Sequence, residues 1–364
     1  MRKRLPPGSE PRQRERRERS VTIALRALCV LAAVVVACPA FGADAPQKQL
    51  SLLCTVPLPW CEALAQAFEK NTGTKVAVTQ KSGADALGIL AAQKGAPRFD
   101  VWYAGTGDSH LQAAEQGLLE EYRSPRLPEL RDWAVRHAQQ TKHRSVALYL
   151  RSVGLVINTR RLAAKQLAEP KCWSDLGRPE YDDQIEMGHP AQSNAARAAL
   201  FAFVQLLGEE KAFELMKRIH GNVDNYTRRA TNAARAVARG DATIGIAFLY
   251  AIAQEVADGF PVKLIVPCEG VAYDVLAMGI VSKARNPDAA RTFYEWALSP
   301  ESLDIGYAFS YWQMPAHRSA ELPSRVVNTD QVKMIDSDLN RFGTVERRRL
   351  LDRWDREVSI LPRN

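Results

Sequence analysis

Leu50-Ser-Leu-Leu-Cys54-Thr-Val-Pro-Leu-Pro-Trp-Cys61 joins an apolar strand to the start of a helix. The pattern predicts a strand over Leu50–Val56 and a helix over Trp60–Lys70, ended by Asn71-Thr-Gly73. Two cysteines this close, in an exported chain, favour a disulfide over a nucleophile. Such a disulfide fixes the first strand-to-helix turn, where open α/β sheets place their ligands.

Two further strand–loop–helix units follow, with strands over Val76–Thr79 and Phe99–Tyr103. Three such units in succession predict a parallel sheet with right-handed crossovers. A second α/β block follows, with expected strands over 185–187 and 243–248 and expected helices over 193–207 and 209–219. The fold class is therefore α/β with two lobes.

Short apolar runs at Val146–Leu150 and Gly154–Asn158 are suited to a crossing between lobes, and Val262–Val266 and Val275–Val281 lead back. We expect a signal peptide over 1–42, the first lobe over 43–152, the second lobe over 153–268, and a return to the first lobe with C-terminal helices over 269–364. Two crossings between lobes describe a hinged clamshell.

The N-terminal segments follow one another in the order that is typical of an export signal. Residues 1–42 hold nine basic and three acidic side chains, then the apolar run Ala27–Ala37 and the small-residue site Ala40-Phe-Gly42. The apolar run is about half of a membrane span, which argues against an anchor helix. Val35-Val-Ala-Cys38 is an alternative lipoprotein cleavage box, and Arg16-Arg17 alone is a weak twin-arginine signal. We expect a periplasmic protein.

Removing the leader changes the charge argument. The whole chain carries a net charge of +8, of which the leader holds six, so the remaining 322 residues keep +2. The basic composition therefore belongs to the leader, and nucleic acid is not an expected partner. A chain of this length is longer than one hydrophobic core usually serves, so two domains are expected.

Four cysteines remain after the leader, and sequence proximity favours the pair Cys54–Cys61, which leaves Cys172–Cys268. Four buried free thiols are the alternative.

Loops after the predicted strands carry small polar residues at helix starts, at Lys81-Ser82-Gly83, Gly105-Thr106-Gly107 and Gln192-Ser193-Asn194. Free N–H groups and hydroxyls at such turns bind anions, although ordinary helix capping explains any one of them. Arg228 and Arg229, between two expected helices, offer guanidinium groups suited to phosphate or carboxylate. Solvated surface arginines are the alternative.

Tyr250 follows a buried strand and Asp274 begins another, a pair suited to holding sugar hydroxyls, with core packing as the alternative. Motifs for catalysis are missing: there is no H-E-x-x-H, G-x-S-x-G, Walker A or G-x-G-x-x-G. We expect no enzyme, no metal and no cofactor.

Several ordered motifs together carry a family resemblance. They are Trp60-Cys-Glu62, Asp100-Val-Trp102, Gly105-Thr-Gly-Asp108, Lys171-Cys-Trp173, Asn225-Tyr-Thr-Arg228, Val266-Pro-Cys-Glu-Gly270 and Leu350-Leu-Asp-Arg-Trp354. The chain resembles the ferric-iron/hexose-phosphate group of extracellular solute-binding proteins of ABC importers, which have the type II periplasmic binding fold. The resemblance covers nearly the whole chain after the leader.

The resemblance implies a ligand cleft between the lobes. Iron-binding members carry adjacent tyrosines where this chain has Leu249-Tyr250-Ala251, which disfavours iron. Sugar-phosphate members have an acidic residue after a tyrosine, as in Tyr273-Asp274, and the comparison places Ser82 and Thr106 on ligand-facing loops. Departures at Ser193-Asn-Ala-Ala-Arg197 and at Thr227-Arg-Arg-Ala230 remove glycines and add positive charge, so we expect an altered specificity that still favours anions.

The resemblance implies a monomer that delivers a sugar phosphate or related organophosphate to an inner-membrane ABC permease. The expected ligand-binding residues are Ser82, Thr106, Gln192, Ser193, Arg228, Arg229, Tyr250 and Asp274. Three alternatives stay open: ferric iron held by Tyr250 with a synergistic anion, a sensory receptor that imports nothing, and an exported enzyme.

Overall fold

The structure is a computed structural model that describes residues 49–228, 230–336 and 338–363. Contacts group the chain into residues 1–45 and 46–364, and every described residue lies in the second unit. The expected signal peptide, with the alternative lipid site Cys38, lies outside the described residues, as does Arg229. None of the described helices has both the length and the apolar composition to cross a bilayer.

Three successive strand–helix pairs form the beginning of the described chain, as predicted. The elements before the first crossing are β1 (Gln49–Cys54), α1 (Leu58–Thr72), β2 (Lys75–Gln80), α2 (Gly83–Ala92), β3 (Val101–Thr106), α3 (Gly107–Glu115), η1 (Leu127–Glu129) and α4 (Asp132–Gln140). Gly73 ends α1 in the left-handed conformation, with φ of 70°, which explains the expected stop there.

The second α/β block has more elements than the sequence indicated. It contains β4 (Val146–Asn158), α5 (Thr159–Ala164), η2 (Trp173–Gly177), η3 (Pro179–Tyr181), β5 (Ile185–Gly188), α6 (Asn194–Leu207), α7 (Glu209–Gly221), β6 (Val223–Thr227), α8 (Ala230–Arg239), β7 (Ile244–Phe248), α9 (Leu249–Ala257) and β8 (Val262–Ile265). Arg228 lies between two helices, α7 and α8, as expected, but directly follows strand β6, which the sequence did not predict.

The C-terminal part of the chain returns to the first block and ends with a helix that packs on the second block. It contains β9 (Ala272–Ile280), α10 (Pro287–Ala297), α11 (Pro300–Asp304), η4 (Ile305–Phe309), β10 (Met314–Pro315), η5 (Thr329–Gln331), α12 (Leu339–Phe342) and α13 (Val345–Glu357).

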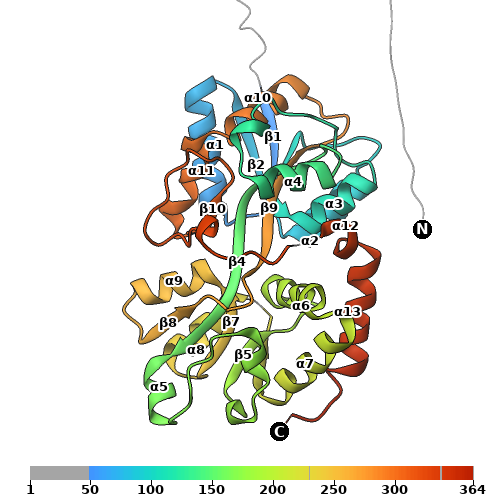
Figure 1. Ribbon diagram of the computed structural model, residues 1–364. Helices are drawn as coiled ribbons and strands as arrows, with labels where there is room; N and C mark the ends of the chain where they lie inside the picture. Colours follow the sequence, from blue (N-terminus) through green and yellow to red (C-terminus); the bar gives the residue numbers. More distant parts are fainter. Residues whose placement is uncertain (1–48, 229, 337, 364) are drawn as a thin grey trace, which may run out of the picture. The chain divides into compact units, whose positions relative to one another are not determined.

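One sheet runs through both blocks in the order β2-β1-β3-β9-β4-β7-β5-β6, with β8 and β10 also paired to β4. The outer pairs β1–β2, β1–β3, β5–β6 and β5–β7 are parallel, as expected. The central pairs β3–β9, β4–β9 and β4–β7 are antiparallel. The sheet is therefore mixed, because β4 and β9 each cross between the blocks in opposite directions (Figure 1).

The two apolar runs of the expected crossing are one strand, β4. Its first half, Val146–Leu150, lies in a hydrophobic core with residues of β1, β3, α10 and α11. Its second half, including Val153 and Ile157, lies in another core with residues of β5, α6 and α7. We call the elements around these cores the first lobe and the second lobe.

Helix α13 belongs to the second core. Leu350, Trp354 and Val358 are buried there, and α13 lies beside α7 in Figure 1. The tail was expected to follow the first lobe, whereas its last helix covers the second. The apolar stripe formed by Leu350 and Trp354 requires a core, but not a particular one.

Candidate functional site

A pocket of about 190 Å³ gathers four of the eight expected ligand residues. Gln192, Ser193, Arg228 and Tyr250 line it together with Asn194, Thr231 and Phe248. These residues come from the loops and helix starts that follow β5, β6 and β7. Because the strand pairs β5–β6 and β5–β7 are parallel, their carboxyl ends meet at one edge. We call this cavity the second-lobe pocket.

Gly188 explains how the loop after β5 turns back over the strand. A Cβ atom on Gly188 would lie 2.2 Å from the Oγ atom of Ser193, closer than any real contact. Ser193 is therefore held against the strand end, where its hydroxyl accepts a hydrogen bond from the Ala196 amide at 3.5 Å and caps α6. The start of α6 faces the pocket through Asn194.

Tyr250 lies in the first turn of α9. Its ring stacks on Phe248 with 5.7 Å between centroids, and the ring of Tyr311 from the first lobe lies 5.6 Å away. Burial raises the pKa of Tyr250 to about 12, so its phenol is protonated and can donate a hydrogen bond at neutral pH. This geometry suits a neutral hydroxyl partner.

Asp274 lies in a different cavity from Tyr250. It lines a space of about 50 Å³ together with Asp108, Arg136, Arg197, Phe342 and other residues of both lobes. Arg151 forms an ion pair with Asp274 and also places its guanidinium carbon 4.6 Å above the Phe248 ring. Burial raises the pKa of Asp274 and Arg151 opposes that shift. Arg151 therefore lies between the two cavities and holds the carboxylate.

Ser82 and Thr106 stand at the N-terminal ends of first-lobe helices α2 and α3, and only the Ser82 side chain caps its helix. Ser82 donates a hydrogen bond to the Asp85 carboxylate at 2.7 Å and accepts one from the Asp85 amide at 3.2 Å. The Thr106 hydroxyl donates to Asp108 and lies 2.9 Å from Ser109 Oγ. Neither residue is among the described residues lining the two cavities. In this arrangement both hydroxyls are engaged within their own loops.

A group of buried and partly buried charges lies between the lobes, and of its members only Asp274 was among the expected site residues. Asp108, Arg151, Arg197, Arg347 and Asp274 act on one another electrostatically, and three of these five are cations. Burial pushes the pKa of Asp108 upward, but Arg197 and Arg347, together with hydrogen bonds from Thr106 and the Ser109 amide, outweigh it and the net shift is downward. The sequence signal was a charged residue within an apolar strand, Leu150-Arg-Ser152, which we had taken as a break between two strands.

Both expected disulfides are present. Cys54–Cys61 links the end of β1 to the first turn of α1, with Cα atoms 6.1 Å apart. Cys172–Cys268 joins the start of η2 to the loop before β9, with Cα atoms 4.8 Å apart.

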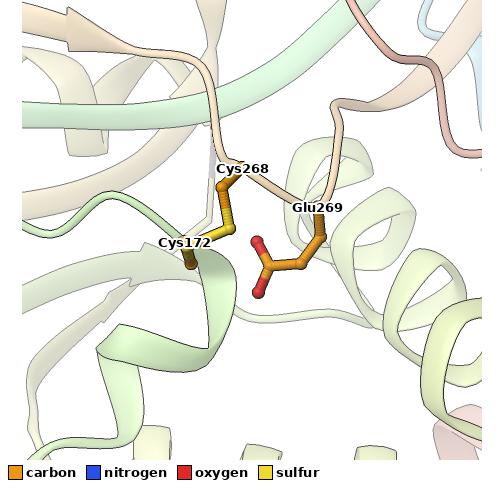
Figure 2. Close-up of side chains that lie close together, drawn as sticks. All are labelled: Cys172, Cys268 and Glu269. Atoms are coloured by element: carbon orange, nitrogen blue, oxygen red, sulfur yellow. A yellow bond between two sulfur atoms is a disulfide. The ribbon is translucent and has the colours of Figure 1, made fainter.

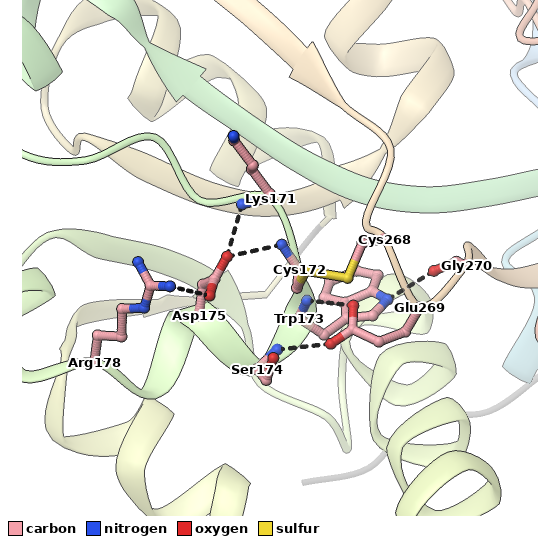
Figure 3. The surroundings of a disulfide bond; sticks show 9 residues. All are labelled: Lys171, Cys172, Trp173, Ser174, Asp175, Arg178, Cys268, Glu269 and Gly270. Atoms are coloured by element: carbon pink, nitrogen blue, oxygen red, sulfur yellow. Dashed lines mark hydrogen bonds and ion pairs between the residues drawn. A yellow bond between two sulfur atoms is a disulfide. The ribbon is translucent and has the colours of Figure 1, made fainter.

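Cys172, Cys268 and Glu269 lie close enough to suggest metal ligands, as Figure 2 shows. Their sulfur atoms are bonded to each other, which removes the thiolates that a metal would need. The Glu269 carboxylate accepts hydrogen bonds from the Trp173 amide at 2.7 Å and the Ser174 amide at 3.1 Å (Figure 3). This cluster is a structural staple.

Comparisons with known proteins agree with this architecture. A family model described as bacterial extracellular solute-binding protein matches residues 97–340. An uncharacterized protein of Haemophilus influenzae is 34% identical over 322 residues, which cover 88% of this chain and 93% of that protein. The major ferric iron-binding protein of Neisseria gonorrhoeae is 28% identical over 197 residues, 53% of this chain and 58% of that protein.

Two solved structures of periplasmic binding proteins are similar throughout. AfuA from Actinobacillus pleuropneumoniae, solved with exogenous fructose-6-phosphate bound, is 33% identical with a TM-score of 0.76, covering 86% of this chain and 99% of AfuA. The periplasmic binding protein P5PA is 30% identical with a TM-score of 0.75, covering 86% of this chain and 100% of P5PA.

Proposed function

We propose that this chain, which belongs to the bacterial extracellular solute-binding protein family, captures a sugar phosphate or related organophosphate. The family implies a small solute as ligand and an ABC permease as partner. The anionic class of the ligand, a monomeric state and the individual binding residues are our proposals.

The composition of the second-lobe pocket carries this proposal. Of the described residues that line it, Arg228 is charged and none is acidic. The guanidinium lies in the same pocket as Ser193 and Asn194 at the start of α6, where backbone N–H groups and the helix dipole favour negative charge. An anionic group is the ligand chemistry that these features favour most.

The remaining pocket residues suit the uncharged part of such a ligand. Gln192 offers both a donor and an acceptor, and the protonated Tyr250 phenol donates to a hydroxyl. Phe248, which is 4% exposed, contributes only a small apolar part of the pocket wall. We place the phosphate near Arg228 and the sugar near Tyr250.

The other expected residues take supporting places in the proposal. Ser82 and Thr106 contribute from the first lobe once their loops exchange internal hydrogen bonds for ligand contacts. Asp274 acts through Arg151, which its carboxylate orients beside Phe248. Arg229 lies outside the described residues, and its place among the proposed binding residues rests on its positive charge. The likeness to AfuA, solved with fructose-6-phosphate, supports the same ligand class.

Thermal-shift measurements on the periplasmic protein test the ligand class. We expect fructose-6-phosphate or glucose-6-phosphate to raise the melting temperature, since a ligand at 100 times its Kd stabilises by about 2.7 kcal/mol. The matched controls are the neutral hexoses, inorganic phosphate and a dicarboxylate. Stabilisation by a neutral hexose but by no anion overturns the proposal.

The proposed location and the import role have separate tests. Sequencing the N-terminus of the periplasmic protein should find Ala43 first, whereas a lipidated Cys38 at that end supports the alternative. Uptake of the labelled ligand should disappear when the gene is deleted. Unchanged uptake together with lost signalling identifies the sensory alternative.

A further inference from the structure

The two C-terminal helices bridge the lobes. We call residues 339–357, comprising α12 and α13, the strap. Figure 1 shows the strap running from beside α3 down to α7. The family model ends at residue 340, before α13 begins. The strap is thus a further link between the lobes, in addition to the two crossing strands β4 and β9.

The lower part of the strap is fixed to the second lobe. Leu350 and Trp354 are buried in the second core. Arg353 lies 2.6 Å from the Glu209 carboxylate and 2.8 Å from that of Glu210, both at the start of α7. Buried apolar surface and charge-assisted contacts together hold α13 as part of this lobe.

The upper part of the strap contacts the first lobe. Arg347 places a guanidinium nitrogen 2.8 Å from the carboxylate of Asp108 in α3. The Gln112 side chain, one turn further along α3, donates a hydrogen bond to the Gly343 carbonyl at 3.4 Å. Phe342 of α12 stacks instead on Phe201 of α6, with 5.0 Å between ring centroids, so α12 itself is packed on the second lobe.

Asp108 depends on the second lobe for its charge partners. Its residue is 8% exposed, and the two guanidinium groups near it come from Arg347 of α13 and from Arg197 of α6, which lies 3.7 Å away. A buried carboxylate without such partners is strongly unfavourable. Moving α3 away from α6 and α13 separates opposite charges, leaving Arg197 without this carboxylate as well.

We propose that Asp108, Arg347 and Arg197 form a latch that holds the two lobes together at the side of α3 and α13. The latch sets how often the lobes separate there. Because β4 and β9 are continuous strands through both cores, separation by bending them must break these ion pairs before the cores move apart. The strap thereby controls access to the space between the lobes, whichever solute the protein binds.

Spin labels across the groove between α3 and α13 test the latch in the ligand-free protein. Gln116 and Asp352 line this groove and are exposed, so Gln116→Cys and Asp352→Cys provide labelling sites. We expect Arg347→Gln to lengthen and broaden the distance distribution between the labels. We also expect hydrogen exchange in residues 339–347 to become about tenfold faster, the factor for losing one modest charge-assisted hydrogen bond.

Arg348→Gln is the matched control, because Arg348 lies on the same helix and lines the exposed groove. It should leave distances and exchange unchanged. Asp108→Asn should change the label distances and the exchange rates more than Arg347→Gln does, because it removes the charged partner of both arginines. Circular dichroism checks that each variant is folded. Arg347→Gln keeps the Asp108–Arg197 contact, so it remains informative if Asp108→Asn fails to fold. Equal distances and equal exchange in Arg347→Gln and Arg348→Gln overturn the latch, and neither readout depends on a sugar phosphate binding.

Discussion

The rings of Tyr250 and Tyr311 lie 5.6 Å apart and 34° from parallel, one from each lobe. The sequence around Tyr250 offers a single phenol, and the fold brings a second one beside it. Two neighbouring tyrosines could supply two phenolate ligands to ferric iron, so this pair is relevant to the iron alternative.

We expect no tyrosinate-to-iron absorption band when ferric nitrilotriacetate is added to the protein. Burial raises the pKa of Tyr250 to about 12 and also raises that of Tyr311, so both phenols resist the ionisation that iron requires. A visible spectrum recorded with and without carbonate is the measurement. A band that disappears in Tyr250→Phe establishes the iron alternative instead.

Arg228→Gln should weaken sugar-phosphate binding about tenfold to a hundredfold. The reason is the loss of a charge-assisted hydrogen bond in a pocket lined by no acidic residue among those described. Isothermal titration with glucose-6-phosphate measures the change. Arg160→Gln, an exposed arginine of the same lobe in α5, is the control and should bind as the parent does. Equal weakening in both variants would indicate only a general charge effect.

Stability should fall as the pH drops from 7.5 to 5.5 because two histidines are buried in neutral form. Burial lowers the pKa of His137 to about 4 and that of His110 well below its ordinary range. A depressed folded pKa means that stability is fully present above the unfolded value of about 6.5 and is lost below it. Each histidine should then cost about 1.4 kcal/mol at pH 5.5.

Urea unfolding at the two pH values measures this loss. His110→Phe should remove about half of it, because His110 stacks on Trp102 at 4.1 Å and neither ring nitrogen has a hydrogen-bond partner in the described structure. The pKa of Asp274 is raised in the folded protein, so its protonation at still lower pH increases the stability of the folded state instead of lowering it. An equal fall in His110→Phe and the parent protein excludes His110 as a source.

Removing the Cys172–Cys268 bridge should lower the free energy of unfolding by roughly 4–5 kcal/mol. The bridge closes a loop with a sequence separation of 96, so it restricts the unfolded chain more than the Cys54–Cys61 bridge with a separation of 7. Cys268 is exposed, so the double variant Cys172→Ala, Cys268→Ala loses little packing. Guanidinium unfolding provides the measurement.

Reductant serves as the control for the disulfide prediction. Added to the double variant, it should lower stability further by only about 2–3 kcal/mol, the contribution expected of the short Cys54–Cys61 loop. A loss below about 1 kcal/mol in the double variant alone contradicts the entropic argument.

Local sequence patterns predicted much of the fold. The three opening strand–helix units, the capped helix after Ser193 and the Cys54–Cys61 pair all follow from short-range rules of periodicity, capping and spacing, and the Cys172–Cys268 pair is what then remains. The shared pocket of Gln192, Ser193 and Tyr250 also follows, because parallel strands bring their carboxyl ends to one edge. Arg228 joins them through strand β6, which the sequence pattern did not predict.

Tertiary structure decided which lobe each later segment joins. The stripe of Leu350 and Trp354 specifies that α13 must bury one face, but either core satisfies that requirement. The same holds for Asp108 and Arg347, which are 239 positions apart and show nothing in sequence that pairs them. Local rules act over one or two turns, whereas the choice between distant partners depends on the burial and charge balance of the whole molecule.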